Sequence, residues 1–297
     1  MKVRVKVPAT TANLGPGFDT IGLALSLHNE FTFFHSPEEV HHDPDNLIYH
    51  SAKYIYDRVG APVDRLQFTV AGEVPMSRGL GSSATCIVGA MVGANELLGR
   101  PFSREELLNF ATEVEGHPDN IAPALYGGCR ISTMEEGRVI THPLDIAPSL
   151  HFFVAIPNFP LATSVAREAL PKALSYGDAV FNISRMVFLV EGLRLGDFQL
   201  VRMGAQDRLH EPYRSKLIRG YGKMASITGE LDGVVLISGA GPTLLLIAPD
   251  TVEPEAAMEL WHKKSQETGA SWEIKHLKLD PEGAVVTLDG EGPAARP

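Results

Sequence analysis

The sequence predicts a mixed α and β protein made of two packed domains, and three observations support this expectation. The chain has 297 residues, more than a single domain usually contains. Segments with alternating apolar residues, typical of strands, are interspersed with segments of helical spacing. Pro143 and Pro148 flank a short polar link that marks the best domain boundary. We therefore expect one domain over residues 1–145 and another over residues 146–297.

Period-two alternation of apolar residues predicts the strands of the first half. They are expected at residues 3–8, 30–36 and 66–74. The first strand has valines on one face and should end at Pro8, where a loop rich in small polar residues begins. The third should turn Leu66, Phe68 and Val70 inward.

Three helical segments are expected in the same half, at residues 47–59, 84–98 and 103–115. The second is rich in alanine and glycine, so it can pack closely along its whole surface. The third begins with a capping box, in which Ser103 and Glu106 each satisfy a backbone N–H of the first turn. It should stop at Gly116, because glycine and the proline that follows end helices.

The second half begins with a strand at residues 151–157, and two or more helices are expected between residues 164 and 228. Residues 233–249 form two apolar runs around the glycine-rich segment 238–243, which predicts a hairpin. A helix at residues 252–267 and a strand at residues 271–277 complete the pattern. The last residues are rich in glycine and proline and should form a frayed tail.

Composition excludes several classes of protein. With 26 basic and 36 acidic residues the formal charge is −10, which argues against a general nucleic-acid binder. Cys86 and Cys129 are too few for a disulfide scaffold and lack metal-binding spacing. The first residues resemble a strand rather than a signal peptide, and no apolar run approaches the length of a membrane span. We therefore expect a cytoplasmic protein.

The most informative segment joins a strand to the small-residue helix. It consists of Pro75, Met76, Ser77, Arg78, Gly79, Leu80, Gly81, Ser82, Ser83 and Ala84. Glycines let the backbone approach an anion closely, and a helix start adds free N–H groups, so the loop is suited to phosphate. The Ser83 hydroxyl could also reach a magnesium ion. Alternatively, the segment is a plain turn between a strand and a helix.

A second candidate site is the segment at residues 113–120, which contains three carboxylates, a histidine and an amide. Magnesium sites normally use one or two carboxylates together with phosphate and water, so one of these acids could be a ligand. The alternative is a solvated helix end, with Asp119 or Asn120 capping the next helix.

Four arginines stand singly among apolar residues in the second half. The arginine fork grips carboxylates and phosphates through paired hydrogen bonds, although most arginines are surface residues without such a task. The candidates are Arg167, Arg185, Arg208 and Arg214. No Ser-His-Asp signature is present, and no Gly-x-Gly-x-x-Gly motif follows the first strand, so hydride transfer is disfavoured.

Residues 8–25 resemble the first motif of the homoserine kinases, a branch of the GHMP kinases of galactose, homoserine, mevalonate and phosphomevalonate. Residues 75–84 are similar to the second, phosphate-binding motif of these kinases, and residues 238–243 to the third. The three occur in the family's order, and residues 115–120 and 207–217 resemble further segments of the same branch. The resemblance implies an α+β fold of two domains. The N-terminal one would be like ribosomal protein S5 domain 2, and the C-terminal one a ferredoxin-like α/β sandwich.

The resemblance also implies roles for individual residues. Those matching substrate-contacting positions are Asn13, Asp19, His117, Asn120, Thr163, Arg167 and Arg214. Asn120 and Arg167 would belong to the catalytic centre, and no residue is assigned as a general base. The loop of residues 75–84 would bind ATP, with Asn46 near the adenine pocket. Ser83 and Glu115 match magnesium ligands, and Glu113 is a rival to Glu115.

The activity implied is ATP-dependent phosphorylation of the L-homoserine hydroxyl, giving O-phospho-L-homoserine for threonine synthesis, in an enzyme that could be a homodimer. Physical reasoning agrees, because an amino-acid zwitterion needs donors such as two arginines for its carboxylate and an acid such as Asp19 for its ammonium. Two alternatives remain. One is another GHMP enzyme, of mevalonate or shikimate type, and the other is a catalytically silent binding protein of the same fold.

Overall fold

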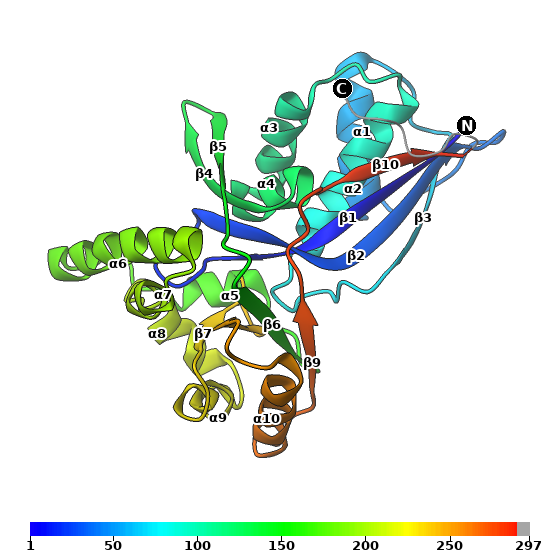
Figure 1. The fold of residues 1–297 in the computed structure, drawn as a ribbon. Coiled ribbons are helices and arrows are strands. Elements are labelled where there is room, and N and C mark those ends of the chain that lie inside the picture. The colour runs from blue at the N-terminus through cyan, green and yellow to red at the C-terminus, as the bar shows by residue number, and fades with distance from the viewer. Residues whose placement is uncertain (290–297) are drawn as a thin grey trace.

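A computed structural model describes residues 1–289, and the expected frayed tail falls mainly at residues 290–297, outside the described residues. The described chain folds around two antiparallel sheets, which lie one above the other in Figure 1. Both helices and strands are present in each half, so the expectation of a mixed α and β fold is confirmed.

The first sheet has the strand order β10-β1-β2-β4-β5, with β3 also paired to β2. The bounds are β1 Lys2–Ala12, β2 Ile21–His35, β3 Leu66–Gly72, β4 Cys129–Glu135, β5 Arg138–Leu144 and β10 Val285–Leu288. The first strand does not end at Pro8, as the sequence suggested. It continues to Ala12 because a register shift between Pro8 and Ala9 accommodates the proline, and β2 begins correspondingly early.

Helices from the first half cover one face of this sheet (Figure 1). They are α1 Leu47–Val59, α2 Ser82–Leu97, α3 Arg104–Glu115 and α4 Pro118–Tyr126. Helix α2 packs closely on β2 because Gly89 and Gly93 lie over the rings of Phe31 and Phe33, where a Cβ atom would come within 2.5 and 2.2 Å of ring carbons. The small residues of this segment thus bring the helix start close to the sheet.

Local sequence signals predicted the start and the end of α3 correctly. Ser103 and Glu106 form the expected capping box, and α3 ends at Gly116 in a left-handed conformation. The expected inward orientation of Val70 is wrong, because its side chain is 47% exposed near the end of β3. Only Leu66 is fully buried among the three residues expected to point inward.

The second sheet has the order β7-β8-β6-β9, with every neighbouring pair antiparallel. Its strands are β6 Leu150–Pro157, β7 Val234–Ile237, β8 Leu244–Pro249 and β9 Trp272–Leu277. The β7–β8 hairpin was expected. The accompanying helices are α5 Thr163–Glu168, α6 Tyr176–Leu195, α7 Phe198–Gly204, α8 Glu211–Arg214, α9 Tyr221–Ala225 and α10 Pro254–Gln266, with 3-10 turns at Ser215–Leu217 and Ser226–Gly229.

The two halves are packed together rather than joined by a free linker. One apolar cluster combines Ile21 and Leu23 from β2 with Phe152 and Val154 from β6 and with Leu189 from α6. The chain then returns to the first sheet, where β10 pairs with β1. Within residues 1–289, no helix is long and apolar enough to cross a membrane.

Candidate active site

A cavity of about 410 Å³ lies where the two halves meet, a size typical of small-molecule sites. It brings together most of the residues that the sequence singled out. From the first half these are Asn13, Asn46, Met76, Ser77, Arg78, Gly79, Gly81, Ser82, Ser83, Glu115, His117 and Asn120, and from the second half Thr163, Arg167 and Arg214.

The loop before α2 presents a helix N-terminus to the cavity. Gly81 precedes the helix in a left-handed conformation with φ of 65°, and no side chain caps the first-turn N–H groups. The first turn also lacks acidic residues. Free N–H groups and the positive end of the helix dipole therefore face the cavity wall formed by Ser82 and Ser83, an arrangement suited to an anion.

The glycine-rich turn between β7 and β8 contacts both this loop and the end of β1. The Ser238 hydroxyl donates to the carbonyl oxygen of Gly79 at 2.6 Å, and the backbone N–H of Gly239 donates to Ala12 at 2.8 Å. A Cβ on Gly79 would lie 2.3 Å from the Ser238 carbonyl oxygen, so only glycine fits there without movement. The glycine-rich turn of the second half thereby fixes the loop of the first half.

Arg78 anchors this loop to β6. Its guanidinium donates to the carbonyl oxygens of Pro157 at 2.9 Å, Asn158 at 3.1 Å and Met76 at 3.1 Å. The hydrogen bonds to Pro157 and Asn158 fix the loop to the second half of the molecule.

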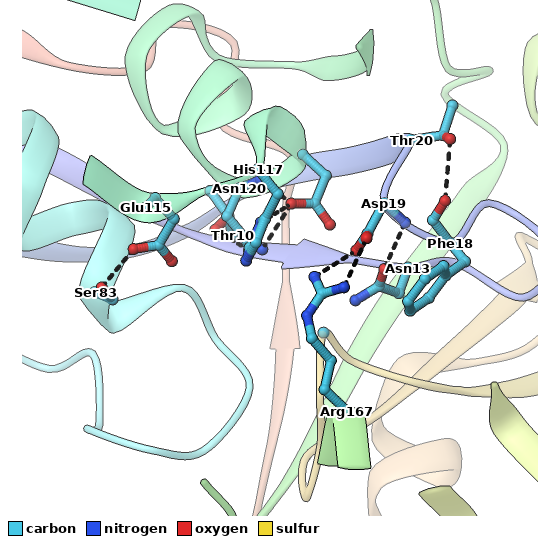
Figure 2. A network of polar contacts seen from close by, with 12 residues as sticks. Thr10, Asn13, Phe18, Asp19, Thr20, Ser83, Glu115, His117, Asn120 and Arg167 are labelled. Carbon is cyan, nitrogen blue, oxygen red and sulfur yellow. Dashed lines mark hydrogen bonds and ion pairs between the residues drawn. The ribbon is translucent and has the colours of Figure 1, made fainter. Parts of the chain in front are cut away.

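Ser83 and Glu115 form an oxygen-rich pair at one end of the cavity (Figure 2). The serine hydroxyl donates to Glu115 Oε2 at 2.6 Å. Burial raises the pKa of Glu115, while the Ser83 hydrogen bond works in the opposite direction. Glu113 points elsewhere, because it pairs with Arg58 at 3.1 Å and bonds to Tyr54 on α1.

Asp19 and Arg167 form an ion pair at the other end of the view in Figure 2. The guanidinium donates to both carboxylate oxygens at 2.9 Å, and this pairing raises the pKa of Arg167. Asn13 holds the loop between β1 and β2, because its Oδ1 accepts from the backbone N–H of Asp19 at 2.8 Å. A carboxylate and a guanidinium thus lie side by side.

Arg214 is the most unusual charge in the cavity. Arg214 is only 1% exposed, yet its guanidinium contacts no carboxylate in the described part of the chain. Its hydrogen bonds go to the carbonyl oxygens of Gly239 at 3.0 Å and Ala166 at 3.5 Å and to His210 at 3.4 Å. Burial, and then the charge of Arg167, lower the pKa of Arg214. A buried cation without an anion is costly, so the site is built to accept one.

Asn120 and His117 lie between the two ends of the site in Figure 2. The Thr10 hydroxyl donates to Asn120 Oδ1 at 2.8 Å, and the Asn120 amide donates to Asp119 Oδ1 at 3.4 Å. The second amide N–H is the donor that Asn120 can offer to the cavity. His117 Nδ1 is 2.5 Å from the buried carboxylate of Asp119. Burial acts to lower the pKa of His117, but Asp119 and neighbouring carboxylates outweigh it and raise the pKa.

Some sequence candidates lie outside the cavity. Arg208 pairs with Asp178 at 3.3 Å, and Arg185 lies over the ring of Phe181 on α6. Pro75, Leu80, Ala84 and Asp19 do not line the cavity. Leu80 and Ala84 are fully buried, and Asp19 borders the cavity through its ion pair with Arg167.

Asn46 borders the cavity as the N-cap of α1, its Oδ1 accepting from the backbone N–H of Ile48 at 3.0 Å. Its neighbours Leu47 and Ile48, with Met76 and Cys86, give that part of the wall an apolar lining. Such a lining suits a flat aromatic group.

Sequence reasoning missed several contributors. Thr10 was included only in a motif, although it orients Asn120. Phe18 lies between two arginines, with its ring 5.0 Å from the Arg214 guanidinium and 5.6 Å from that of Arg167. The aromatic residue directly before Asp19 was the available signal, but only the fold brings both arginines to it.

Comparisons with known proteins identify the family of this chain. Residues 46–128 match the family described as GHMP kinases N terminal domain. A homoserine kinase of Clostridium beijerinckii is 42% identical over 96% of this chain and 98% of its own length. A homoserine kinase of Crocosphaera subtropica is 43% identical over 96% of this chain and 97% of its own length.

Solved structures agree in fold. The crystal structure of a homoserine kinase from Cytophaga hutchinsonii superposes with a TM-score of 0.84 at 26% identity, covering 96% of this chain and 97% of that one. The phosphomevalonate kinase of Streptococcus pneumoniae has a TM-score of 0.69 at 12% identity, covering 93% and 99%, which supports the fold alone.

Proposed function

Because this chain belongs to the GHMP kinases and, within them, to the homoserine kinase family, we propose that its interdomain cavity is the site where L-homoserine meets ATP. The reaction transfers the γ-phosphoryl group of ATP to the side-chain hydroxyl, giving O-phospho-L-homoserine for threonine biosynthesis. We also propose a cytoplasmic location, in keeping with a biosynthetic reaction that consumes ATP. The residue roles below are our assignments.

The phosphates of ATP bind at the start of α2. The support is the uncapped first turn, preceded by a loop whose glycines leave the backbone accessible. The remaining ATP-binding residues are assigned to the loop of residues 75–84, and Asn46 with its apolar neighbours contacts the adenine. Arg78 contributes by fixing the loop.

Ser83 and Glu115 suit a magnesium ion, because both offer hard oxygen ligands within 2.6 Å of one another beside the phosphate site. The residues described contain no group of three histidine, cysteine, aspartate or glutamate residues that could hold a metal. This fits Mg²⁺, which takes its remaining ligands from phosphate and water. When bound, the ion would neutralise charge on the phosphates.

The zwitterion of homoserine binds at the opposite end of the cavity. Asp19, oriented by Asn13, takes the ammonium, and Arg167 and Arg214 take the carboxylate. The observation that supports this most strongly is the buried guanidinium of Arg214, which lacks an anionic partner among residues 1–289. Thr163 and His117 complete the proposed contacts.

The substrate hydroxyl then lies near Asn120, between the amino-acid end and the phosphate end. Its oxygen attacks the γ-phosphorus while the bond to the ADP oxygen breaks, and the hydroxyl proton passes to an oxygen of the transferred phosphoryl group and then to solvent. The loose transition state of phosphoryl transfer requires mainly positioning and charge stabilisation. We assign Asn120 and Arg167 to the catalytic centre and propose no general base.

We keep the division at residue 145 as a proposal. It separates the residues assigned to ATP and magnesium from Thr163, Arg167 and Arg214, and the sheets also change between β5 and β6. The first part nevertheless supplies Asn13 and Asp19 to the substrate, and β10 returns to the first sheet.

Coupled measurement of ADP release tests the function. With ATP and Mg²⁺ present, turnover is expected with L-homoserine and not with mevalonate or shikimate, because those acids lack the ammonium that Asp19 would bind. Absence of turnover with L-homoserine would favour the catalytically silent alternative, and preference for another substrate would favour another GHMP kinase.

Gly81 provides a test of the phosphate loop. A Cβ here would lie 1.9 Å from Thr10 Oγ1 and 3.2 Å from Asn120 Oδ1, so Gly81→Ala should displace both the loop and Asn120. We expect kcat/KM for ATP to fall on the order of 100-fold. Gly99→Ala is the matched control, because Gly99 has a φ of 80° but open space around it. Equal losses in the two variants would attribute the effect to backbone strain alone.

A second copy of this chain is proposed to pack on α6, the helix that projects from the left of the molecule in Figure 1. Tyr176, Val180, Ile183 and Val187 form an apolar stripe with exposures of 94%, 63%, 67% and 63%. Their spacing of four, three and four residues reads the same in both directions, so two antiparallel copies of the stripe match one another.

Light scattering after size exclusion tests this homodimer. Ile183→Glu should convert a dimeric protein into a monomer, because it places a charge at the centre of the stripe. Gln199→Glu adds the same charge at an exposed position of α7 and should leave the dimer intact. A wild-type monomer, or equal dissociation in both variants, would contradict the assignment of α6.

A further inference from the structure

His210 is a fully buried imidazole placed directly before α8, and it contacts both the first-motif loop and Arg214. Its Nε2 lies 2.8 Å from the carbonyl oxygen of Gly15, which is 195 residues distant in sequence. Its Nδ1 lies 3.4 Å from Nη1 of Arg214. The function described above assigns it no role.

The partners of His210 determine its protonation. A carbonyl oxygen can only accept, so Nε2 must bear a hydrogen to bond with Gly15. The Arg214 guanidinium can only donate, so Nδ1 must be unprotonated. Only the neutral tautomer with hydrogen on Nε2 satisfies both. Burial lowers the pKa of His210, Arg214 lowers it further and Asp207 opposes them, so the net direction favours this neutral form.

The backbone of His210 is fixed independently of its ring. The Asp207 carboxylate, which is fully buried, accepts from the backbone N–H groups of Leu209 at 3.0 Å, His210 at 2.8 Å and Glu211 at 2.8 Å. It also accepts from the Asn182 side chain on α6 at 2.6 Å. Asp207 therefore fixes the backbone position of His210, so the imidazole can hold the Arg214 guanidinium in one orientation.

The loop on the other side is also held closely. A Cβ on Gly15 would lie 2.8 Å from the carbonyl oxygen of Ala205 at the end of α7, so the loop and this helix end are in direct contact. The Phe18 ring lies 5.3 Å from the imidazole and 5.0 Å from the Arg214 guanidinium. Asp19 follows Phe18 directly, so one cluster connects the proposed ammonium and carboxylate sites.

We propose that His210 is a positioning residue that orients the Arg214 guanidinium and ties it to the loop containing Asp19, so that the two charged ends of the substrate are recognised at a fixed separation. This inference rests on the proposed role of Arg214 in binding the homoserine carboxylate. It would make the imidazole a determinant of selectivity for a short α-amino acid, although the ring itself contacts no substrate.

Three variants separate the two contacts of the ring. His210→Phe removes both while keeping an aromatic ring. His210→Asn ends near the position of Nδ1, so its Oδ1 can still accept from Arg214. His210→Gln ends near the position of Nε2, so its amide can still donate to Gly15 but offers Arg214 no acceptor at the former Nδ1 position.

The Phe variant should raise KM for homoserine about tenfold, with kcat and KM for ATP changed much less, because the carboxylate is held alike in ground and transition states. The Asn variant should recover more of this loss than the Gln variant. The proposal would be overturned if homoserine KM were unchanged in the Phe variant or if KM for ATP rose in parallel. It would also be overturned if the Gln variant recovered more of the loss than the Asn variant. If the Phe variant fails to fold, the order of Asn and Gln decides the question.

A readout independent of turnover distinguishes this proposal from the proposed function. Nitrogen-15 NMR of histidine-labelled wild-type protein should show His210, identified by its loss in the variants, as the neutral tautomer protonated on Nε2 near pH 7. Protonation on Nδ1, or a charged ring, would overturn the proposal even in an active kinase. If homoserine is not turned over but this tautomer is found, the proposed function fails while the local geometry stands.

Discussion

Replacing Glu115 by glutamine should lower kcat on the order of 100-fold at saturating ATP and Mg²⁺, which is the first of the two largest effects that we expect. Glutamine keeps the shape of the side chain but removes the negative charge that would bind the ion. It can still accept from Ser83, so the local hydrogen bond at 2.6 Å need not be lost. The measurement is steady-state ADP release over a range of Mg²⁺ concentrations.

Glu113→Gln is the matched control, because the two glutamates stand two residues apart on α3 but point in different directions. Glu113 faces Arg58 and Tyr54 on α1, away from the cavity. We expect its kcat to change less than about twofold, as for a surface ion pair. The reverse ranking of the two variants would place the magnesium ligand at Glu113.

Arg214→Met should lower kcat/KM for homoserine on the order of 100-fold, or about 3 kcal/mol, because it removes a buried partner of the substrate carboxylate. Methionine keeps an unbranched side chain as far as the position of Nε and has no charge. Since the free enzyme holds this guanidinium without a carboxylate partner among the described residues, the variant should be at least as stable as wild type. Activity and thermal unfolding measured on the same sample check both statements.

Arg208→Met is the control for Arg214→Met, because Arg208 is exposed and pairs with Asp178 outside the cavity. It should leave kcat/KM for homoserine nearly unchanged. KM for ATP should stay close to wild type in both variants. A matching loss of ATP affinity in Arg214→Met would show that Arg214 supports the nucleotide site instead.

Local signals in the sequence predicted some elements closely. Helix α1 occupies the expected residues 47–59 because Asn46 caps its start and Gly60 ends it in a left-handed conformation. The expected end of the first strand was wrong, because a proline usually interrupts a strand and the irregularity at Pro8 that accommodates it leaves no clear mark in the sequence. Helix α4 was expected only within the alternative in which Asp119 or Asn120 caps a next helix, and the helix instead begins at Pro118 with His117 as its N-cap.

The composition of the site was easier to predict than its geometry. Motifs brought Asn13, Ser83 and Arg167 to attention, and all three line one cavity. Spacing alone could not choose between Glu113 and Glu115, because the choice depends on which way α3 faces. In the same way, nothing local distinguishes Arg214 from Arg208. Only tertiary packing buries Arg214 beneath Gly239 and leaves Arg208 at the surface.

The contacts that orient the site were the least predictable. Thr10 and Asn120 are 110 residues apart, and His210 and Gly15 are 195 residues apart. Each pair depends on the packing of separate segments, for which a single sequence contains no signal.

The most direct test of the account is a crystal structure of the enzyme with L-homoserine, Mg²⁺ and a non-hydrolysable ATP analogue. We expect the homoserine carboxylate within hydrogen-bonding distance of Arg214 and Arg167, its ammonium at Asp19 and its hydroxyl directed toward the γ-phosphate at the start of α2. Mg²⁺ should contact Ser83 and Glu115. A carboxylate bound away from Arg214, or phosphates bound away from the loop of residues 75–84, would contradict the central claim.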